Sequence, residues 1–171
     1  MKLHIGMRKM KSLIALSITF VIWQLIRVFL PMLEVHPVFA YAYSVIEIRE
    51  TPDKTKKFGQ LRIKATFIGL IVGLVFMALS VFVASKINSE MWRILTELLF
   101  ILLATLISLL IAENAECENF CALAAIIPII CMVAHNEQDI YLYAIMRGVQ
   151  TLIGVFTAMF INVFINKNAK Q

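Results

Sequence analysis

Two arginines in this sequence each precede a threonine by four residues, Arg62 with Thr66 and Arg147 with Thr151. Residues four apart lie on one face of a helix, so each guanidinium shares a face with a hydroxyl. Arg147 also stands at the predicted start of its helix, where the backbone dipole disfavours a cation by about 0.3–1 kcal/mol unless an anion is near. These four residues are therefore our candidates for binding a carboxylate.

Simpler roles also account for these charges. Arg147 is alternatively an interfacial anchor paired with Glu137 or Asp139, and the excess of basic residues on the inner side of membranes is enough to explain Arg62. Glu97, one turn inside a predicted membrane helix, is a candidate proton carrier, but an ion pair with Arg93, four residues earlier, is the preferred interpretation.

Each arginine also begins a pattern of small residues. Seven and eleven positions after Arg62 come Gly69 and Gly73, and the same offsets from Arg147 give Gly154 and Ala158. Because an interior glycine costs a helix about 1 kcal/mol relative to alanine, its repeated use on one face predicts close helix–helix packing. The recurrence of the pattern suggests an internal duplication.

Composition places the chain among integral membrane proteins. Hydrophobic residues make up 61% of it, charged residues only 16%, and the mean hydropathy is +0.86. The formal net charge of +5 comes from lysines and arginines at the ends of apolar segments, so it indicates topology, and we expect no nucleic-acid partner. A metal site on Glu113, Cys117 and Cys121 is conceivable, but small packing residues are the preferred interpretation, and we expect no metal, cofactor or disulfide framework.

Six apolar segments are predicted to form transmembrane helices, at about 12–30, 38–48, 61–85, 91–112, 119–134 and 141–166. Residues 49–64 are interpreted as the main hydrophilic loop. Pro37 begins the second segment, which is short, and Pro128 is expected to kink the fifth. The basic N-terminus resembles that of a signal peptide, but we find no cleavage site and predict a retained first helix.

Basic residues predict the orientation of these helices. With both termini cytoplasmic, 12 of the 16 lysines and arginines fall on the inner side. The helices bearing Gly69 and Gly154 then run in opposite directions. We therefore predict an all-α membrane protein in which one module, residues 1–171, holds two inverted three-helix repeats, about 8–85 and 91–166. The second and fifth segments then correspond, and we align Phe39-Ala40 with Phe120-Cys121.

Four stretches in this order resemble the aromatic acid exporter family in its fusaric-acid-resistance-like (FUSC-like) branch: Gly6 to Lys11, His36 to Ala40, the Arg62 to Gly73 stripe, and Tyr141 to Asn162. The resemblance covers nearly the whole chain. It implies a six-helix module of exporters of aromatic or amphipathic carboxylic acids. Gln150 stands where the resemblance leads us to expect an acidic residue, and the family's full-length exporters carry two such modules and soluble portions.

The sequence therefore predicts a multi-pass cell-membrane protein that is a subunit of an organic-anion exporter and not an enzyme, because its three histidines are scattered without paired catalytic side chains. Its expected partners are the lipid bilayer, a small organic anion and a second copy in a homodimer or other oligomer. The alternative is a structural or regulatory membrane protein that does not transport.

Overall fold

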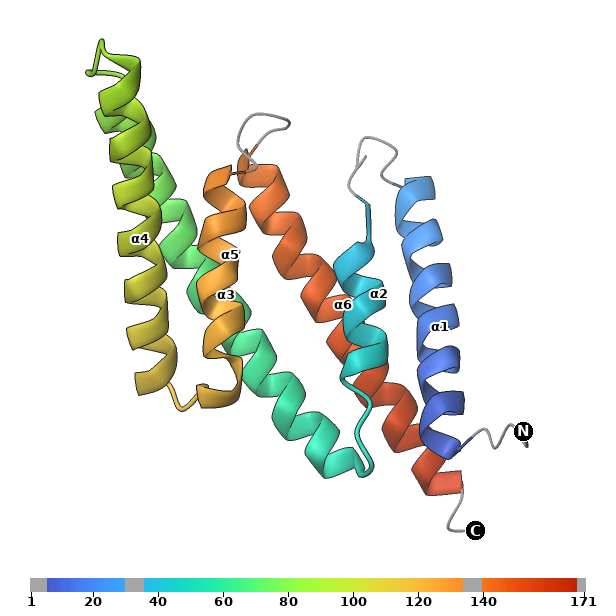
Figure 1. Ribbon diagram of the computed structural model, residues 1–171. Coiled ribbons are helices and arrows are strands. Elements are labelled where there is room, and N and C mark those ends of the chain that lie inside the picture. The colour runs from blue at the N-terminus through green and yellow to red at the C-terminus, as the bar shows by residue number, and fades with distance from the viewer. Residues whose placement is uncertain (1–5, 30–35, 134–139, 169–171) are drawn as a thin grey trace, which may run out of the picture. The chain divides into compact units, whose positions relative to one another are not determined.

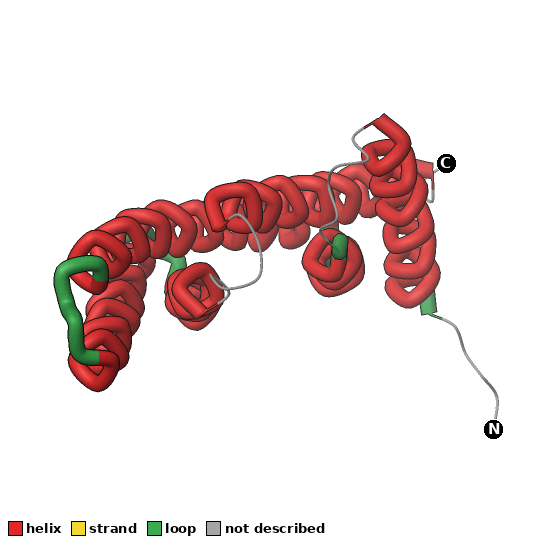
Figure 2. The backbone as a smooth tube through the Cα atoms, turned by 90° about the horizontal axis from the view of Figure 1, so that it is seen from above, coloured by secondary structure: helices red, strands yellow, loops and turns green. Residues whose placement is uncertain are grey.

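Helices make up the regular structure of the chain. The computed structural model describes residues 6–29, 36–133 and 140–168, and within these ranges it contains no strand (Figure 2). The α-helices are α1 (Met7–Phe29), α2 (Val38–Ile46), α3 (Pro52–Ala84), α4 (Glu90–Asn114), α5 (Cys121–Val133) and α6 (Ile140–Asn168), and a 3-10 turn, η1 (Glu118–Phe120), precedes α5. The predicted all-α class is confirmed.

The chain divides into two compact units, each drawn from separate parts of the sequence. Unit 1 comprises Met1–Ile63 and Val149–Gln171, and unit 2 comprises Lys64–Gly148. Helices α3 and α6 therefore each contribute one end to unit 1 and the other end to unit 2. Within unit 1, α1 packs beside α2, and within unit 2, α4 packs beside α5 (Figure 1).

Buried residues recur every fourth position on the outer helices, as expected for one contacting face of a helix. On α1 they are Lys11, Ala15, Thr19 and Trp23, and on α4 they are Ala104, Ser108 and Ala112. Apart from Lys11 and Trp23 these side chains are small, so they allow neighbouring helices to approach. The rest of each helix surface carries exposed apolar side chains, mainly leucine and isoleucine.

The hydrophilic loop predicted at residues 49–64 is wrong, because α3 begins at Pro52. Pro52 occupies the first helical position, Thr51 accepts a hydrogen bond from the Lys54 backbone N–H at 3.3 Å, and Asp53 lies in the first turn. One face of this first part of α3 is buried, and it carries Thr55, Gly59 and Arg62. The helix therefore forms because that face packs, although its other faces are basic.

Helix α4 ends in a Schellman motif. Glu116 has φ of 60°, the Cys117 N–H donates to Ala112 O at 2.9 Å, and the Glu116 N–H donates to Glu113 O at 3.0 Å. These bonds satisfy carbonyls that the helix end would otherwise leave unpaired. The acidic connection predicted between the fourth and fifth segments is thus a tight turn.

Four helices are long and apolar enough to cross a membrane: α1, α3, α4, and residues Ile145–Asn166 of α6. Helices α2 and α5 have only 9 and 13 residues. At about 1.5 Å per residue, neither reaches the roughly 30 Å of a hydrocarbon core. These lengths are consistent with a membrane protein.

Candidate functional site

One face of α6 follows α2 from its beginning to its end. The Gln150 side chain contacts the start of α2, Gly154 its middle, and Asn162 the turn after it. These residues are spaced by multiples of four, so they form one stripe. Because residue numbers increase in the same direction along both helices, α2 and this part of α6 are parallel within unit 1.

Gln150 caps the N-terminus of α2. Its side-chain oxygen accepts a hydrogen bond from the Phe39 N–H at 3.3 Å, and its amide nitrogen donates to His36 O at 3.1 Å. The α2 N-cap residue, Pro37, makes no side-chain capping bond, so Gln150 satisfies a backbone donor that the helix start leaves unpaired. An ionised carboxylate could accept from Phe39 but could not donate to His36, which gives the amide at this position a specific structural use.

Gly154 allows α6 to touch the backbone of α2. A Cβ added at Gly154 would lie 2.5 Å from Ala40 O and 2.9 Å from the Tyr43 Cβ. One turn later, Ala158 is buried with Ala15, Ile48 and Ile161 in an apolar cluster. The helix pair therefore depends on the absence of a side chain at Gly154.

Asn162 lies at the centre of a buried polar network around the α2–α3 turn. Its amide nitrogen donates to Arg49 O at 2.9 Å and contacts Thr55 Oγ1, and its oxygen accepts from Lys11 Nζ at 2.8 Å. Lys11 also donates to Asn166 Oδ1. The turn is therefore held from α1, α3 and α6 at once.

Glu47 and Arg62 form an ion pair inside unit 1. The Glu47 carboxylate is fully buried, Arg62 is 9% exposed, and Arg62 Nε contacts Glu47 Oε1. The Arg62 guanidinium also lies over the Tyr43 ring, 4.6 Å from its centroid. Burial raises the pKa of the Glu47 carboxyl, and the charges of Arg62 and Arg49 act in the opposite direction. Arg62 is thus bound to a side chain of its own unit.

A second glycine contact holds α3 against α5 in unit 2. A Cβ added at Gly69 would lie 2.7 Å from Ala124 O and 2.9 Å from the Ile127 Cβ, and one added at Gly73 would lie 3.0 Å from the Pro128 Cα. These helices also run parallel, because the later glycine meets the later residue of α5. Pro128 is buried at this contact inside α5.

The remaining candidate residues are all buried. The predicted place of Arg147 at the start of its helix is wrong, because α6 begins at Ile140 and Arg147 lies two turns further on, 6% exposed in unit 2. Its charge acts on the Cys131 thiol of the same unit. Thr66 is buried in unit 2 and Thr151 in unit 1, and the Thr66 hydroxyl has no hydrogen-bond partner among the described residues. The proposed partners of Arg147, Glu137 and Asp139, lie outside the described residues.

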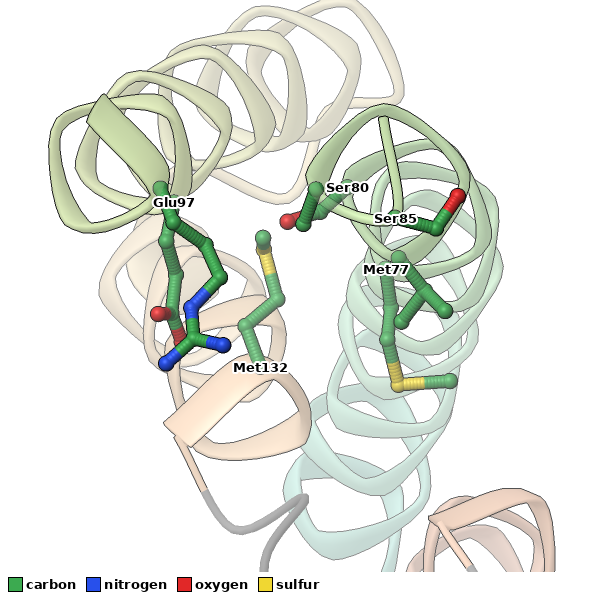
Figure 3. A pocket seen from close by; sticks show the side chains of 8 residues that line it. Met77, Ser80, Ser85, Glu97 and Met132 are labelled. Atoms are coloured by element: carbon green, nitrogen blue, oxygen red, sulfur yellow. The ribbon is translucent and has the colours of Figure 1, made fainter. Parts of the chain in front are cut away.

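A cavity of about 420 Å³ opens in unit 2 between the C-terminal end of α3, the start of α4 and the end of α5 (Figure 3). Arg93 and Glu97 both line it, and over the residues that the structure describes no ion pair joins them. The expected Arg93–Glu97 pair is therefore not formed, and both charges border the same space. The other lining residues are Met77, Ser80, Val81, Ala84, Ser85 and Met132.

Several of these functional residues escaped the sequence analysis. Lys11 was interpreted only as one of the basic residues of the N-terminus, and Glu47 was not selected as a candidate. Glu97 was considered as a proton carrier or as the partner of Arg93, but neither residue was expected to line a cavity. The spacing of Thr55, Gly59 and Arg62 before Thr66 could have indicated that the buried face of α3 extends backward. The partners of Lys11 and Glu47 lie on other helices, which a local pattern does not identify.

Comparison with known proteins identifies no relative: no family model matches the chain, and neither does any curated protein or solved structure.

Proposed function

We propose that the chain is a subunit of a membrane transporter that moves small organic anions across the cell membrane. The apolar helices support a membrane location. The matching helix pairs in the two units support a repeat architecture of the kind that secondary transporters use. The resemblance of the sequence to the aromatic acid exporters supports the choice of substrate class.

The observation that carries this proposal is the correspondence between two glycine contacts. Gly69 of α3 contacts Ala124 and Ile127 of α5, and Gly154 of α6 contacts Ala40 and Tyr43 of α2. In each pair a glycine meets a backbone oxygen and then a Cβ three residues later. We infer two three-helix repeats, α1–α3 and α4–α6, in which the last helix of each repeat packs on the short helix of the other.

These contacts also favour a different alignment of the short helices. The sequence analysis aligned Ala40 of the first repeat with Cys121 of the second. The glycine contacts instead make Ala40 correspond to Ala124, because each supplies the backbone oxygen that faces a glycine. The same offset relates Glu47 to Cys131. The repeat is easier to recognise from its contacts than from its residues because the matched side chains differ in chemistry.

This alignment distinguishes the two arginines. Arg62 contacts the Glu47 carboxylate, whereas the corresponding residue near Arg147 is Cys131, a thiol. Glu47, directly after α2, contacts the first guanidinium, and Cys131 of α5 occupies the matching position. Arg62 therefore serves the structure of unit 1, and we propose Arg147, which shares a helix face with Thr151, as the residue that contributes the charge for the transported anion.

Anion flux tests this assignment. In proteoliposomes with aromatic carboxylates such as benzoate, Arg147→Gln is expected to lower flux by about tenfold or more, as expected from losing a charged hydrogen bond of about 1.5–3 kcal/mol. Arg147→Lys keeps the positive charge but loses the planar pair of N–H donors of the guanidinium. Its flux is therefore expected to lie between that of the wild type and that of Arg147→Gln.

The control variant is Arg27→Gln, which removes an exposed arginine near the end of α1 and is expected to leave flux unchanged. Thermal unfolding in detergent confirms that each variant is folded. Unchanged flux in a folded Arg147→Gln protein would exclude the anion-binding role and leave Arg147 as an anchor.

We further propose that the chain crosses the membrane six times, with α2 and α5 each covering only part of the thickness of their crossings, both termini cytoplasmic, and two copies of the chain forming the transporter. Single cysteines placed at Glu50 and Asn88 in a cysteine-free background test the crossings. Six crossings put residue 50 inside and residue 88 outside, because 12 basic residues then face the cytoplasm. If α2 and α5 do not cross, impermeant thiol reagents will label residue 50 from outside and spare residue 88.

One observation favours a second candidate function, a structural or regulatory membrane protein. The polar groups of unit 1 bind one another: Glu47 contacts Arg62, and Lys11 contacts Asn162. Contacts of this kind stabilise a fold without needing a ligand. This candidate predicts no flux above that of empty liposomes for any aromatic acid, in a protein that is folded and inserted.

A further inference from the structure

The cavity of unit 2 is lined by two opposite charges, two serines and apolar side chains. Met77 and Met132 line it, each 3% exposed, and the Ser80 hydroxyl is directed toward Met132 and Glu97 (Figure 3). Ser85 also lines it, but its hydroxyl donates to Phe82 O at 2.8 Å. Ser80 is thus the hydroxyl that this cavity offers to a ligand, beside the charges of Arg93 and Glu97.

Those charges select the class of ligand. Arg93 and Glu97 are four residues apart on α4, so they border the cavity from one face of one helix. A simple anion near Arg93 would be repelled by Glu97, and a simple cation near Glu97 would be repelled by Arg93. A ligand with an anionic group and an ammonium group a few ångströms apart satisfies both.

The position of the cavity along the membrane helices indicates that this ligand is a lipid. It lies where two helices long enough to span the bilayer, α3 and α4, end and begin. Trp92, beside Arg93, is 64% exposed, and tryptophan is enriched at the level of lipid headgroups. Val81 of α3 lines the cavity and is 52% exposed, so it offers an apolar surface for an acyl chain.

We propose that this cavity binds the headgroup of phosphatidylethanolamine. The phosphate accepts hydrogen bonds from the Arg93 guanidinium, and the primary ammonium donates to the Glu97 carboxylate and the Ser80 hydroxyl. An acyl chain packs against Val81 at the edge of the cavity. The inference depends on α3 and α4 crossing the membrane and not on transport, so its failure would leave the proposed function untouched.

Lipid retention measured by native mass spectrometry tests the proposal on the full chain. Phosphatidylcholine is the matched lipid, because it has the same phosphate but a quaternary ammonium without N–H donors. We expect phosphatidylethanolamine to be retained about tenfold better, equivalent to about 1.4 kcal/mol. Equal retention of the two lipids would overturn the proposal.

Variants separate the two charges. Glu97→Gln is expected to abolish the preference for phosphatidylethanolamine over phosphatidylcholine, and Arg93→Gln to lower retention of both. Glu90→Gln, which removes an exposed carboxylate from the start of the same helix but away from the cavity lining, is expected to change neither. A preference that survives Glu97→Gln contradicts the proposed ammonium contact.

Two further measurements complete the test. Ser80→Leu fills the cavity without changing a charge, and it is expected to reduce lipid retention while the protein keeps its unfolding temperature in lipid-free detergent. Soluble phosphoethanolamine carries the same charges without acyl chains. If it protects the protein from unfolding as well as the lipid does, the ligand is a soluble zwitterion and the lipid assignment is wrong.

Discussion

A protein with alanine at position 154 is expected to lose the packing of α6 on α2. The single added Cβ would lie 2.5 Å from Ala40 O, and neither backbone can move aside without disturbing its helix. Overpacking of this kind costs about 1–3 kcal/mol, and it exceeds the gain of about 1 kcal/mol in helix propensity when glycine becomes alanine. Thermal unfolding of the purified protein in detergent measures the loss.

The control lies in the same helix. Among the described residues, a Cβ at Gly148 would meet only Leu70 Cδ1, at 3.2 Å, and that methyl is the end of a flexible side chain. Gly148→Ala is therefore expected to be neutral or stabilising, whereas Gly69→Ala should damage unit 2 as Gly154→Ala damages unit 1. If Gly154→Ala unfolds no sooner than Gly148→Ala, the close contact does not stabilise the fold.

Removal of the Glu47 carboxylate is expected to lower the free energy of unfolding by more than removal of a charge at the protein surface does. Glu47→Leu leaves Arg62 buried without its counter-charge, and breaking such a pair typically costs about 3–5 kcal/mol. The double variant Glu47→Leu with Arg62→Leu is expected to recover most of that loss, because no isolated charge then remains. Denaturant unfolding in mixed micelles measures all three proteins.

Glu50→Gln is the matched control, because Glu50 pairs with Lys54 at the surface, with side chains 77% and 61% exposed. An exposed pair contributes about 0–1 kcal/mol, so little change is expected. Should the Glu47→Leu single variant match wild type while the double variant does not, the ion pair would not be the stabilising contact.

The helical class and the close-packed glycines follow from local sequence patterns, and the polar interior does not. A charge-free run and a spacing of four are visible in a single segment, which is why Gly69 and Gly154 could be selected in advance. Lys11 and Asn162 are 151 residues apart, and no local periodicity relates them. Basic residues such as Lys11 also indicate the orientation of membrane helices, so a buried hydrogen-bonding role is not expected from their presence.

The short helices show a related limit. Their lengths were predicted well, but the residues that correspond between them could not be identified from chemistry alone. Glu47 and Cys131 correspond only when the two repeats are aligned by the residues that Gly154 and Gly69 contact on the short helices. The cavity was not predicted, because an ion pair between Arg93 and Glu97 was the preferred interpretation, whereas both residues border an open space.

The hydrogen bonds that α6 makes to α2 set an order of assembly during synthesis. Gln150 bonds to His36, 114 positions earlier, and Asn162 bonds to Arg49, 113 positions earlier. A chain emerging from the ribosome N-terminus first completes Lys64–Gly148, a continuous stretch, before the residues that close unit 1 exist. The first helices to enter the bilayer are thus among the last to become fully packed. Until then, lipid or the insertion machinery must cover the surfaces that α6 later contacts.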